Sequence, residues 1–168
     1  MTRMELDEAI WACHVPMLRL AMSILRHAQN AEDAVSNAVI LAYQKIDTLR
    51  DPAALKAWLM KITVRCCYDL LRRRKREVLL AEPGADEAVL FEEPVQDSLY
   101  TRLQKLPQPQ SQVLVLYYYE GYSTEEISRI LGLPRPAVSM RMSRGRARLK
   151  AMLEEEERKE RAYAESNL

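Results

Sequence analysis

Apolar residues recur every three or four positions along most of the chain, which is the spacing of an amphipathic α-helix. The first apolar stripe covers residues 5–27, and a second begins after Asn30, a residue type suited to cap a helix N-terminus. Asp51 and Pro52 have the form of a third helix start, with Asp as the cap and Pro at the first helical position. The stripe behind them continues to about Arg76. Because nothing reads as a strand, the pattern predicts an all-α fold.

The helical periodicity stops between residues 77 and 97. This segment is broken by Pro83 and Pro94, and it holds seven acidic residues and no Lys or Arg. Such a composition favours an extended or flexible linker. We therefore expect two small helical domains, over 1–76 and 98–153, joined by the acidic linker 77–97 and followed by a charged tail over 154–168.

The second half of the chain ends in a predicted helix-turn-helix. A short helix over 99–106 and a compact apolar helix from Ser111 come first. Ser123 followed by Glu126 is a capping-box pattern, so the next helix is expected over Thr124 to Leu131. A turn at Gly132-Leu133-Pro134 separates it from a longer helix that begins at about Arg135. The inward stripe of this longer helix is Val138, Met142, Gly145 and Leu149.

The charge pattern separates the blocks in the same way. The formal net charge is only +1, but it is +5 over residues 1–76, −7 over 77–97, +6 over 98–153 and −3 over 154–168. Two basic blocks therefore stand on either side of an acidic strip, and each generates a local field that the net charge conceals.

The basic residues of the last helix predict DNA binding. From Arg135 to Lys150 the only charged residues are basic, and they avoid the apolar stripe. A solvated helix face is the simpler interpretation of such a run, but the capped helix and the glycine turn in front of it favour a helix for the major groove. Arg135, Ser139 and Met140 are candidate base readers, and Arg141 and Arg144 are better placed for phosphates.

The long helix before the linker carries a second basic cluster, Arg72 to Arg76. Cations at a helix C-terminus also interact favourably with the helix dipole, but five in succession exceed that need. Trp58 and Tyr68 lie on the same helix, and an aromatic ring on a basic helix is suited to stack on an unpaired base. Partial burial in the core is the competing interpretation for Trp58.

No set of residues suggests catalysis, a metal or a cofactor. The two histidines, His14 and His27, lie far from any plausible nucleophile. Cys66 and Cys67 are adjacent and Cys13 is isolated, which predicts buried thiols rather than a zinc site or a disulfide. No apolar run approaches the length of a membrane span, and the N-terminus lacks the apolar core of a signal peptide, so a cytoplasmic protein is expected.

Two segments resemble one known family. Residues 30–76 resemble region 2, and residues 106–153 resemble region 4, of the extracytoplasmic-function sigma factors of bacterial RNA polymerase. The resemblance implies a non-enzymatic subunit that recognises promoters and assists their melting. Its first domain would bind the polymerase clamp and the minus-ten element, and its second would bind the minus-thirty-five element.

The resemblance also implies roles for individual residues. Polymerase binding would fall on Asp33, Ser36, Asn37, Val39 and Ile40. Binding of the minus-ten element would fall on Lys56, Trp58, Lys61 and Arg65, with Arg72 and Arg73 from the basic cluster. Binding of the minus-thirty-five element would fall on Arg135, Pro136, Ser139, Met140, Arg141, Arg144 and Arg148.

The implied partners are core RNA polymerase and promoter DNA, with no small-molecule substrate. Members of the family are commonly held inactive by a membrane-associated anti-sigma factor, which adds a third candidate partner. Two alternatives stay open. One is a helix-turn-helix regulator that binds operator DNA without polymerase, and the other is an interaction module that occupies polymerase without starting transcription.

Overall fold

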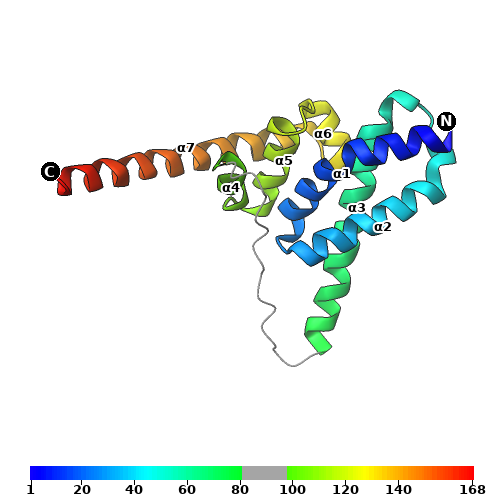
Figure 1. Cartoon of the computed structure of the whole chain (residues 1–168), viewed down its shortest axis with the longest axis horizontal. Coiled ribbons are helices and arrows are strands. Elements are labelled where there is room, and N and C mark those ends of the chain that lie inside the picture. The colour runs from blue at the N-terminus through cyan, green and yellow to red at the C-terminus, as the bar shows by residue number, and fades with distance from the viewer. Residues whose placement is uncertain (81–97) are drawn as a thin grey trace.

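The computed structural model describes residues 1–80 and 98–168, and within these ranges it contains seven α-helices, two short 3₁₀ turns and no strand (Figure 1). The all-α prediction is confirmed for this part of the chain. Residues 81–97, which make up most of the predicted linker, lie outside the described residues.

Three helices form an N-terminal bundle: α1 (Arg3–Leu25), α2 (Ala28–Lys45) and α3 (Leu55–Leu80). Each contributes fully buried side chains to the bundle's core, among them Leu20, Ala34 and Leu59. Two 3₁₀ turns, Ile46–Thr48 and Pro52–Ala54, connect α2 to α3. Pro16 lies inside α1 and does not end it.

The predicted start of α2 at Asn30 is wrong. The helix begins at Ala28, and the Nδ1 atom of His27 accepts the cap hydrogen bond from the Asn30 backbone N–H at 3.3 Å. Arg26 makes the turn from α1 in the left-handed conformation, with φ 52°, so His27 is already in position to cap. Asn30 is therefore buried within the first turn of the helix.

The start of α3 agrees with the prediction, but its end does not. The Asp51 side chain accepts from the Ala53 backbone N–H at 3.0 Å, and Pro52 opens the turn that leads into the helix. The helix continues to Leu80 rather than ending near Arg76. Arg and Lys are good helix formers, and no Gly or Pro occurs before Pro83, so the basic run has no reason to stop the helix.

The second half of the chain contains α4 (Ser98–Gln104), α5 (Gln108–Tyr118), α6 (Thr124–Leu131) and α7 (Arg135–Ser166), which we call the C-terminal bundle. The predicted start of α5 at Ser111 is wrong: the helix begins at Gln108, because the first turn of a helix tolerates a proline such as Pro109. The last residues expected as a charged tail continue α7 away from the bundle as an exposed helix (Figure 1).

α1 is long and apolar enough to span a membrane by length and composition alone, contrary to the expectation from the sequence. Its apolar residues have another role in the structure. Leu6, Met17 and Leu20 are fully buried against the other helices, and core helices of globular proteins pass the same test.

The two bundles pack against one another, with α5 on α1 and α6 on α3 (Figure 1). Arg19 of α1 forms an ion pair with Glu120 at 2.8 Å, and the Glu120 side chain is only 7% exposed. The Arg26 guanidinium donates to the Leu106 carbonyl, and the Gln108 amide donates to the Ile24 carbonyl. The interface is therefore rich in polar contacts.

Candidate nucleic-acid and polymerase interfaces

The helix-turn-helix is present where the sequence predicts it. The Ser123 hydroxyl accepts from the Glu126 backbone N–H at 3.2 Å, and the Glu126 carboxylate accepts from the Ser123 backbone N–H at 2.8 Å. This capping box satisfies two backbone donors at the start of α6. Gly132 closes the helix with φ 66°, a conformation that favours glycine.

One side of α7 is fixed in the core of the C-terminal bundle. Val138, Met142 and Gly145 are buried and Leu149 is half-buried, as the spacing predicts. Gly145 allows the close approach of α5, because a Cβ atom at this position would lie 2.8 Å from Leu114 Cδ1. The opposite side of α7 is consequently presented outwards.

The candidate residues for duplex DNA lie away from this buried stripe. Six of the seven are exposed and one, Arg141, is half-buried. Their side chains occupy the first four turns of α7, where a helix in the major groove contacts bases and the neighbouring phosphates. The exposed six are Arg135, Pro136, Ser139, Met140, Arg144 and Arg148.

Two tyrosines contact the side chain of Arg146 in α7. Its Nε donates to the Tyr118 hydroxyl at 3.0 Å. Its guanidinium also lies over the rings of Tyr117 and Tyr118, at 5.3 and 5.8 Å from their centroids. These contacts direct the Arg146 side chain towards α5 and away from the outward face of α7.

The candidate residues for the minus-ten element fall into two groups on α3. Trp58, Lys61, Arg65 and Arg72 follow one another at steps of three, four and seven, so they share one face of the helix. Lys61, Arg65 and Arg72 are exposed, and Trp58 is half-buried against the core. We call these four residues, with Tyr68, the basic face of α3.

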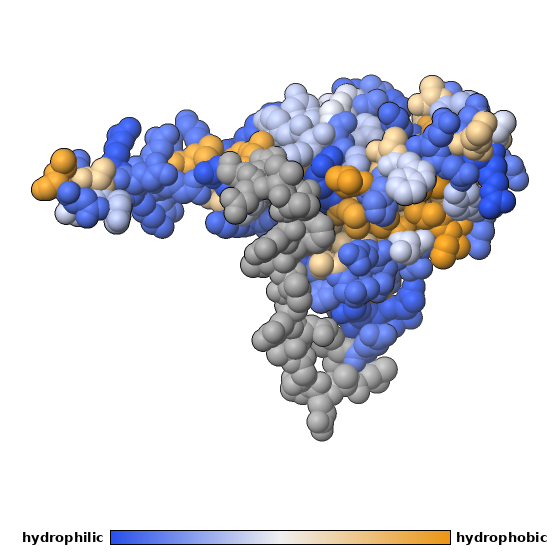
Figure 2. Space-filling view, viewed as in Figure 1, coloured by the Kyte–Doolittle hydropathy of each residue, from blue (hydrophilic) through white to orange (hydrophobic). Residues whose placement is uncertain are grey.

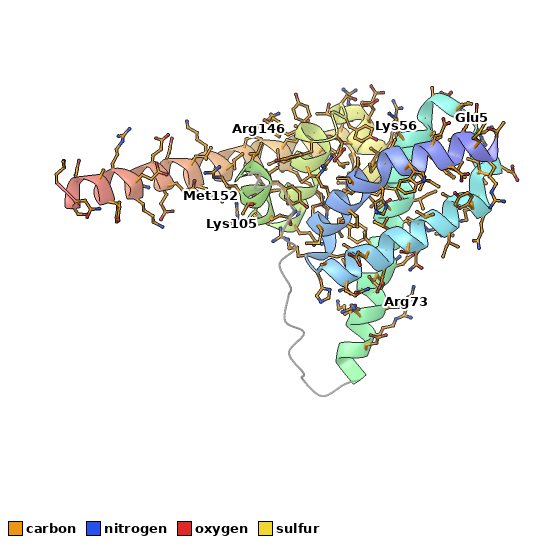
Figure 3. The ribbon with its side chains drawn as sticks, in the orientation of Figure 1. Glu5, Lys56, Arg73, Lys105, Arg146 and Met152 are labelled. Atoms are coloured by element: carbon orange, nitrogen blue, oxygen red, sulfur yellow. The ribbon has the colours of Figure 1, made fainter. Side chains whose placement is uncertain are left out.

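Lys56 and Arg73 are not on the basic face. Lys56 is two residues from Trp58, a rotation of about 200° around the helix, and it lies near α6 (Figure 3). Arg73 is one residue from Arg72 and occupies the part of α3 that projects from the bundle (Figure 3). The structure therefore does not bring these two side chains together with the other four.

Tyr68 belongs to the basic face although the predicted set omits it. It lies three residues after Arg65 and four before Arg72, which is the spacing that identifies the face. Its hydroxyl hydrogen-bonds with the amide of Gln112 in α5, 3.1 Å from Nε2. One edge of the basic face is thus covered by the C-terminal bundle.

The candidate residues for polymerase binding line the outer side of α2. Ala34, Val35, Ala38 and Ala42 of this helix are buried on its inner side. On the outer side Asp33, Ser36, Asn37 and Ile40 are exposed, and Val39 is half-buried. We call this surface the outer face of α2.

The three thiols are buried, as predicted. Burial raises the pKa of Cys13, Cys66 and Cys67, most strongly for Cys67. In the described ranges no three His, Cys, Asp or Glu side chains gather as a ligand set. Burial, followed by electrostatic interactions with Cys13, Glu120 and Glu126, also raises the pKa of Tyr122 to about 12.

Comparison with protein families gives two matches in the order of the two bundles. The model described as "Sigma-70 region 2" matches residues 10–77, and the model described as "Sigma-70, region 4" matches residues 96–149. The second match contains the helix-turn-helix, and the first contains the basic face of α3 and the outer face of α2.

Similar curated proteins include sigma factors of bacterial RNA polymerase. The extracytoplasmic-function RNA polymerase sigma factor SigM of Mycobacterium tuberculosis is 31% identical over 155 residues, which cover 90% of this chain and 78% of that protein. EcfG of Rhodopseudomonas palustris, another sigma factor of this kind, is 32% identical over 150 residues, which cover 83% of this chain and 80% of that protein.

Solved structures agree with the relatives. The sigma factor RpoE of Bartonella quintana, in complex with the anti-sigma factor NepR, is 26% identical with a TM-score of 0.77, covering 88% of this chain and 96% of that one. CnrH, in complex with the cytosolic domain of CnrY, is 26% identical with a TM-score of 0.62, covering 89% of this chain and 87% of that one.

The two family matches, the relatives and the helix-turn-helix lead to one assignment. Sigma factors act with RNA polymerase in the bacterial cytoplasm and are not known as enzymes. The chain belongs to the extracytoplasmic-function sigma factors of bacterial RNA polymerase, which recognise promoters in transcription initiation.

Proposed function

We propose that this chain directs core RNA polymerase to promoters through three surfaces: α7 binds the minus-thirty-five element, the basic face of α3 binds the minus-ten element, and the outer face of α2 binds the polymerase. The chain acts in the cytoplasm and has no catalytic activity of its own. Residues 1–76 and 98–153 are the two binding domains in this proposal, and 77–97 is the tether between them.

The one-sidedness of α7 is the observation that carries the proposal. Val138 and Met142 hold one side of the helix in the core, and the exposed arginines emerge from the other sides. Neutralising phosphates releases counterions from DNA, so such a helix gains affinity for any duplex and reads sequence with the side chains of its first turns. Arg135, Ser139 and Met140 are the base readers in this proposal, and Arg141 and Arg144 bind phosphates.

The basic face of α3 has the chemistry of a single-strand surface. Lys61 and Arg65 supply charge for the phosphate backbone. Trp58 and Tyr68 supply aromatic rings, on which an unpaired base stacks with about 1–3 kcal/mol. We assign the first contacts with the melting minus-ten strand to this face.

The tether and a regulatory partner complete the arrangement. Residues 81–97, after the end of α3, hold six acidic residues and no Lys or Arg, a charge that suits passage through a basic channel built for nucleic acid. Two weak DNA sites on one chain also bind as one when both are engaged. The two solved structures compared above are complexes with anti-sigma factors, NepR and CnrY, and we propose that an anti-sigma factor likewise binds this chain.

Run-off transcription with core polymerase, a library of promoter fragments and this protein tests the proposal. We expect transcripts that require the protein and that share two sequence elements upstream of their start. Stable binding of core polymerase without a transcript from any fragment would favour an interaction module. Tight, specific binding of duplex DNA without polymerase would favour a free-standing regulator.

A further inference from the structure

α1 presents an apolar stripe to solvent on the side opposite the core. Met4, Trp11 and Val15 are all exposed, and Trp11 is 83% exposed. They lie at steps of seven and four residues, so they share one face of the helix. Figure 2 shows apolar side chains gathered on this end of the molecule, over the N-terminal bundle.

Trp11 is too exposed to add much to the buried core. Trp is usually well buried in folded proteins, and the chain's other tryptophan, Trp58, is half-buried against the core. Large exposed apolar groups that lie together mark interaction surfaces, and Trp is among the residue types that dominate binding energy at them.

The stripe lies beside the outer face of α2. Tyr43 of α2 donates a hydrogen bond to Asp7 of α1, and the Arg3 guanidinium lies 5.7 Å from the centre of the Tyr43 ring. α1 and α2 run in opposite directions (Figure 1), so one turn forward along α1 corresponds to one turn back along α2. One turn beyond Asp7 is Trp11, and one turn before Tyr43 are Val39 and Ile40.

We propose that Trp11 is the main apolar anchor of the polymerase-binding surface, with α1 and α2 forming one continuous docking face. The inference rests on the proposed function of the outer face of α2. That face alone offers little apolar area, because Ser36 and Asn37 are polar and Val39 is half-buried. Ile40 is its one large exposed apolar side chain, at 55%.

The charges around this face define the partner. Glu8 lies between Met4 and Trp11 on α1, and Glu32 and Asp33 lie on α2, all three exposed. With Trp11, Val15 and Ile40 as the apolar centre, these acids lie at its edge, and such a face fits a surface of the polymerase large subunit that carries apolar side chains flanked by Lys or Arg. Such borders speed association, while the buried aromatic anchor holds the complex.

Affinity of the full chain for core polymerase, measured by biolayer interferometry, tests the inference. We expect Trp11→Ala to weaken binding at least tenfold and Ile40→Ala to weaken it by a smaller factor. Tyr163→Ala is the matched control, because Tyr163 is also an exposed aromatic, at 73%, but lies on the projecting end of α7. It should bind polymerase like the unaltered chain.

A second measurement separates direct contact from a change in folding. With 5-fluorotryptophan in the chain, the ¹⁹F resonance that is missing from Trp11→Ala belongs to Trp11, and it should shift when core polymerase is added. If the Trp11 resonance does not shift, Trp11 does not contact the polymerase. The inference is also overturned if Trp11→Ala binds polymerase normally while Ile40→Ala binds more weakly. Either outcome leaves the proposed function of the outer face of α2 standing. Failure of the unaltered chain to bind polymerase overturns the proposed function as well. A dimer in sedimentation that Trp11→Ala dissociates assigns the stripe to a second copy and overturns the inference.

Discussion

At Gly145, α7 passes so close to α5 that an added Cβ atom would lie 2.8 Å from Leu114 Cδ1 and 3.3 Å from Gln110 Cβ. Leu114 is fully buried, so its side chain has little space into which to move. Alanine gains about 1 kcal/mol in helix propensity, but overpacking a core costs about 1–3 kcal/mol. We therefore expect Gly145→Ala to lower the free energy of unfolding, measured by urea denaturation.

Ser143→Ala is the control for this substitution, since Ser143 is exposed two residues earlier in the same helix. It should leave the urea midpoint unchanged or raise it slightly. Gly145→Val should lower the midpoint further than Gly145→Ala. Equal midpoints for Gly145→Ala and the unaltered chain would mean that α5 and α7 separate easily at this point.

Single residues were predictable where the determining contact is local. Ser123 and Glu126 are three positions apart, so the sequence alone shows that their side chains reach each other's backbone. The inward position of Gly145 likewise follows from its spacing to Met142. The role of His27 as the cap of α2 was not predicted. Its Nδ1 atom can cap the helix only because Arg26 makes a left-handed turn, and no sequence pattern indicates that turn.

For α7 as an element, the arrangement of arginines predicts two kinds of effect on promoter binding. In the proposed roles, Arg141 and Arg144 bind phosphates, so Arg141→Ala and Arg144→Ala should each weaken binding of all promoter sequences and reduce the slope of log affinity against log salt by about one. Arg135 is a base reader in the same proposal, so Arg135→Ala should relax the preference at one base pair. Fluorescence anisotropy with polymerase and a promoter series measures both quantities.

Arg161→Ala removes the same charge from the exposed end of α7 and serves as the control. It should change neither the slope nor the preference. Equal, sequence-independent losses for the substitutions of Arg135, Arg141 and Arg144 would contradict the division between base readers and phosphate contacts.

The sequence predicted which helices exist better than it predicted where each helix begins and ends. Apolar spacing located every helix of the described ranges, because each must bury one face. Their ends depend on weaker signals. α3 continues through its basic run to Leu80, and α5 includes Pro109 in its first turn, because neither charge nor an early proline opposes a helix. The basic face of α3 was predicted only in part, since Lys56 lies on another side.

The packing of the two bundles was not predictable from the sequence. Arg19 and Glu120 are about a hundred positions apart, and each is one polar residue with no periodic signal. The same is true of Tyr68 and Gln112. Long-range polar contacts of this kind depend on the tertiary arrangement of the helices. Only the structure reveals that the two bundles lie against each other.

This packed arrangement differs from the one that promoter binding requires. Elements at minus ten and minus thirty-five are about 25 base pairs apart, or about 85 Å along B-DNA. A compact chain of this length has a radius of gyration of about 15 Å. On the proposed assignment of α3 and α7 to the two elements, the bundles must therefore separate, and the cost of separation lowers the apparent affinity for DNA.

Many of the contacts between the bundles are polar, and one buried donor among them is unsatisfied. Arg19 is central to them, because its guanidinium pairs with Glu120 and lies 5.5 Å from the centre of the Tyr119 ring. The Nε atom of Arg26, at the same interface, is buried without a hydrogen-bond partner. Such an interface opens at moderate cost, and removal of Arg19 should favour the open state.

Cys13 reports on this opening. It is buried, and the charges of Lys56 and of Glu120 in the opposite bundle act on its pKa. We expect Arg19→Ala to speed maleimide labelling of Cys13 several-fold, as mass spectrometry of its peptide would show. Cys66 and Cys67, buried in α3, should stay protected, whereas faster labelling of all three would indicate unfolding of the bundle. Arg3→Ala, at the far end of α1, should leave the rate unchanged. If Arg19→Ala also leaves Cys13 unchanged, this contact does not hold the bundles closed.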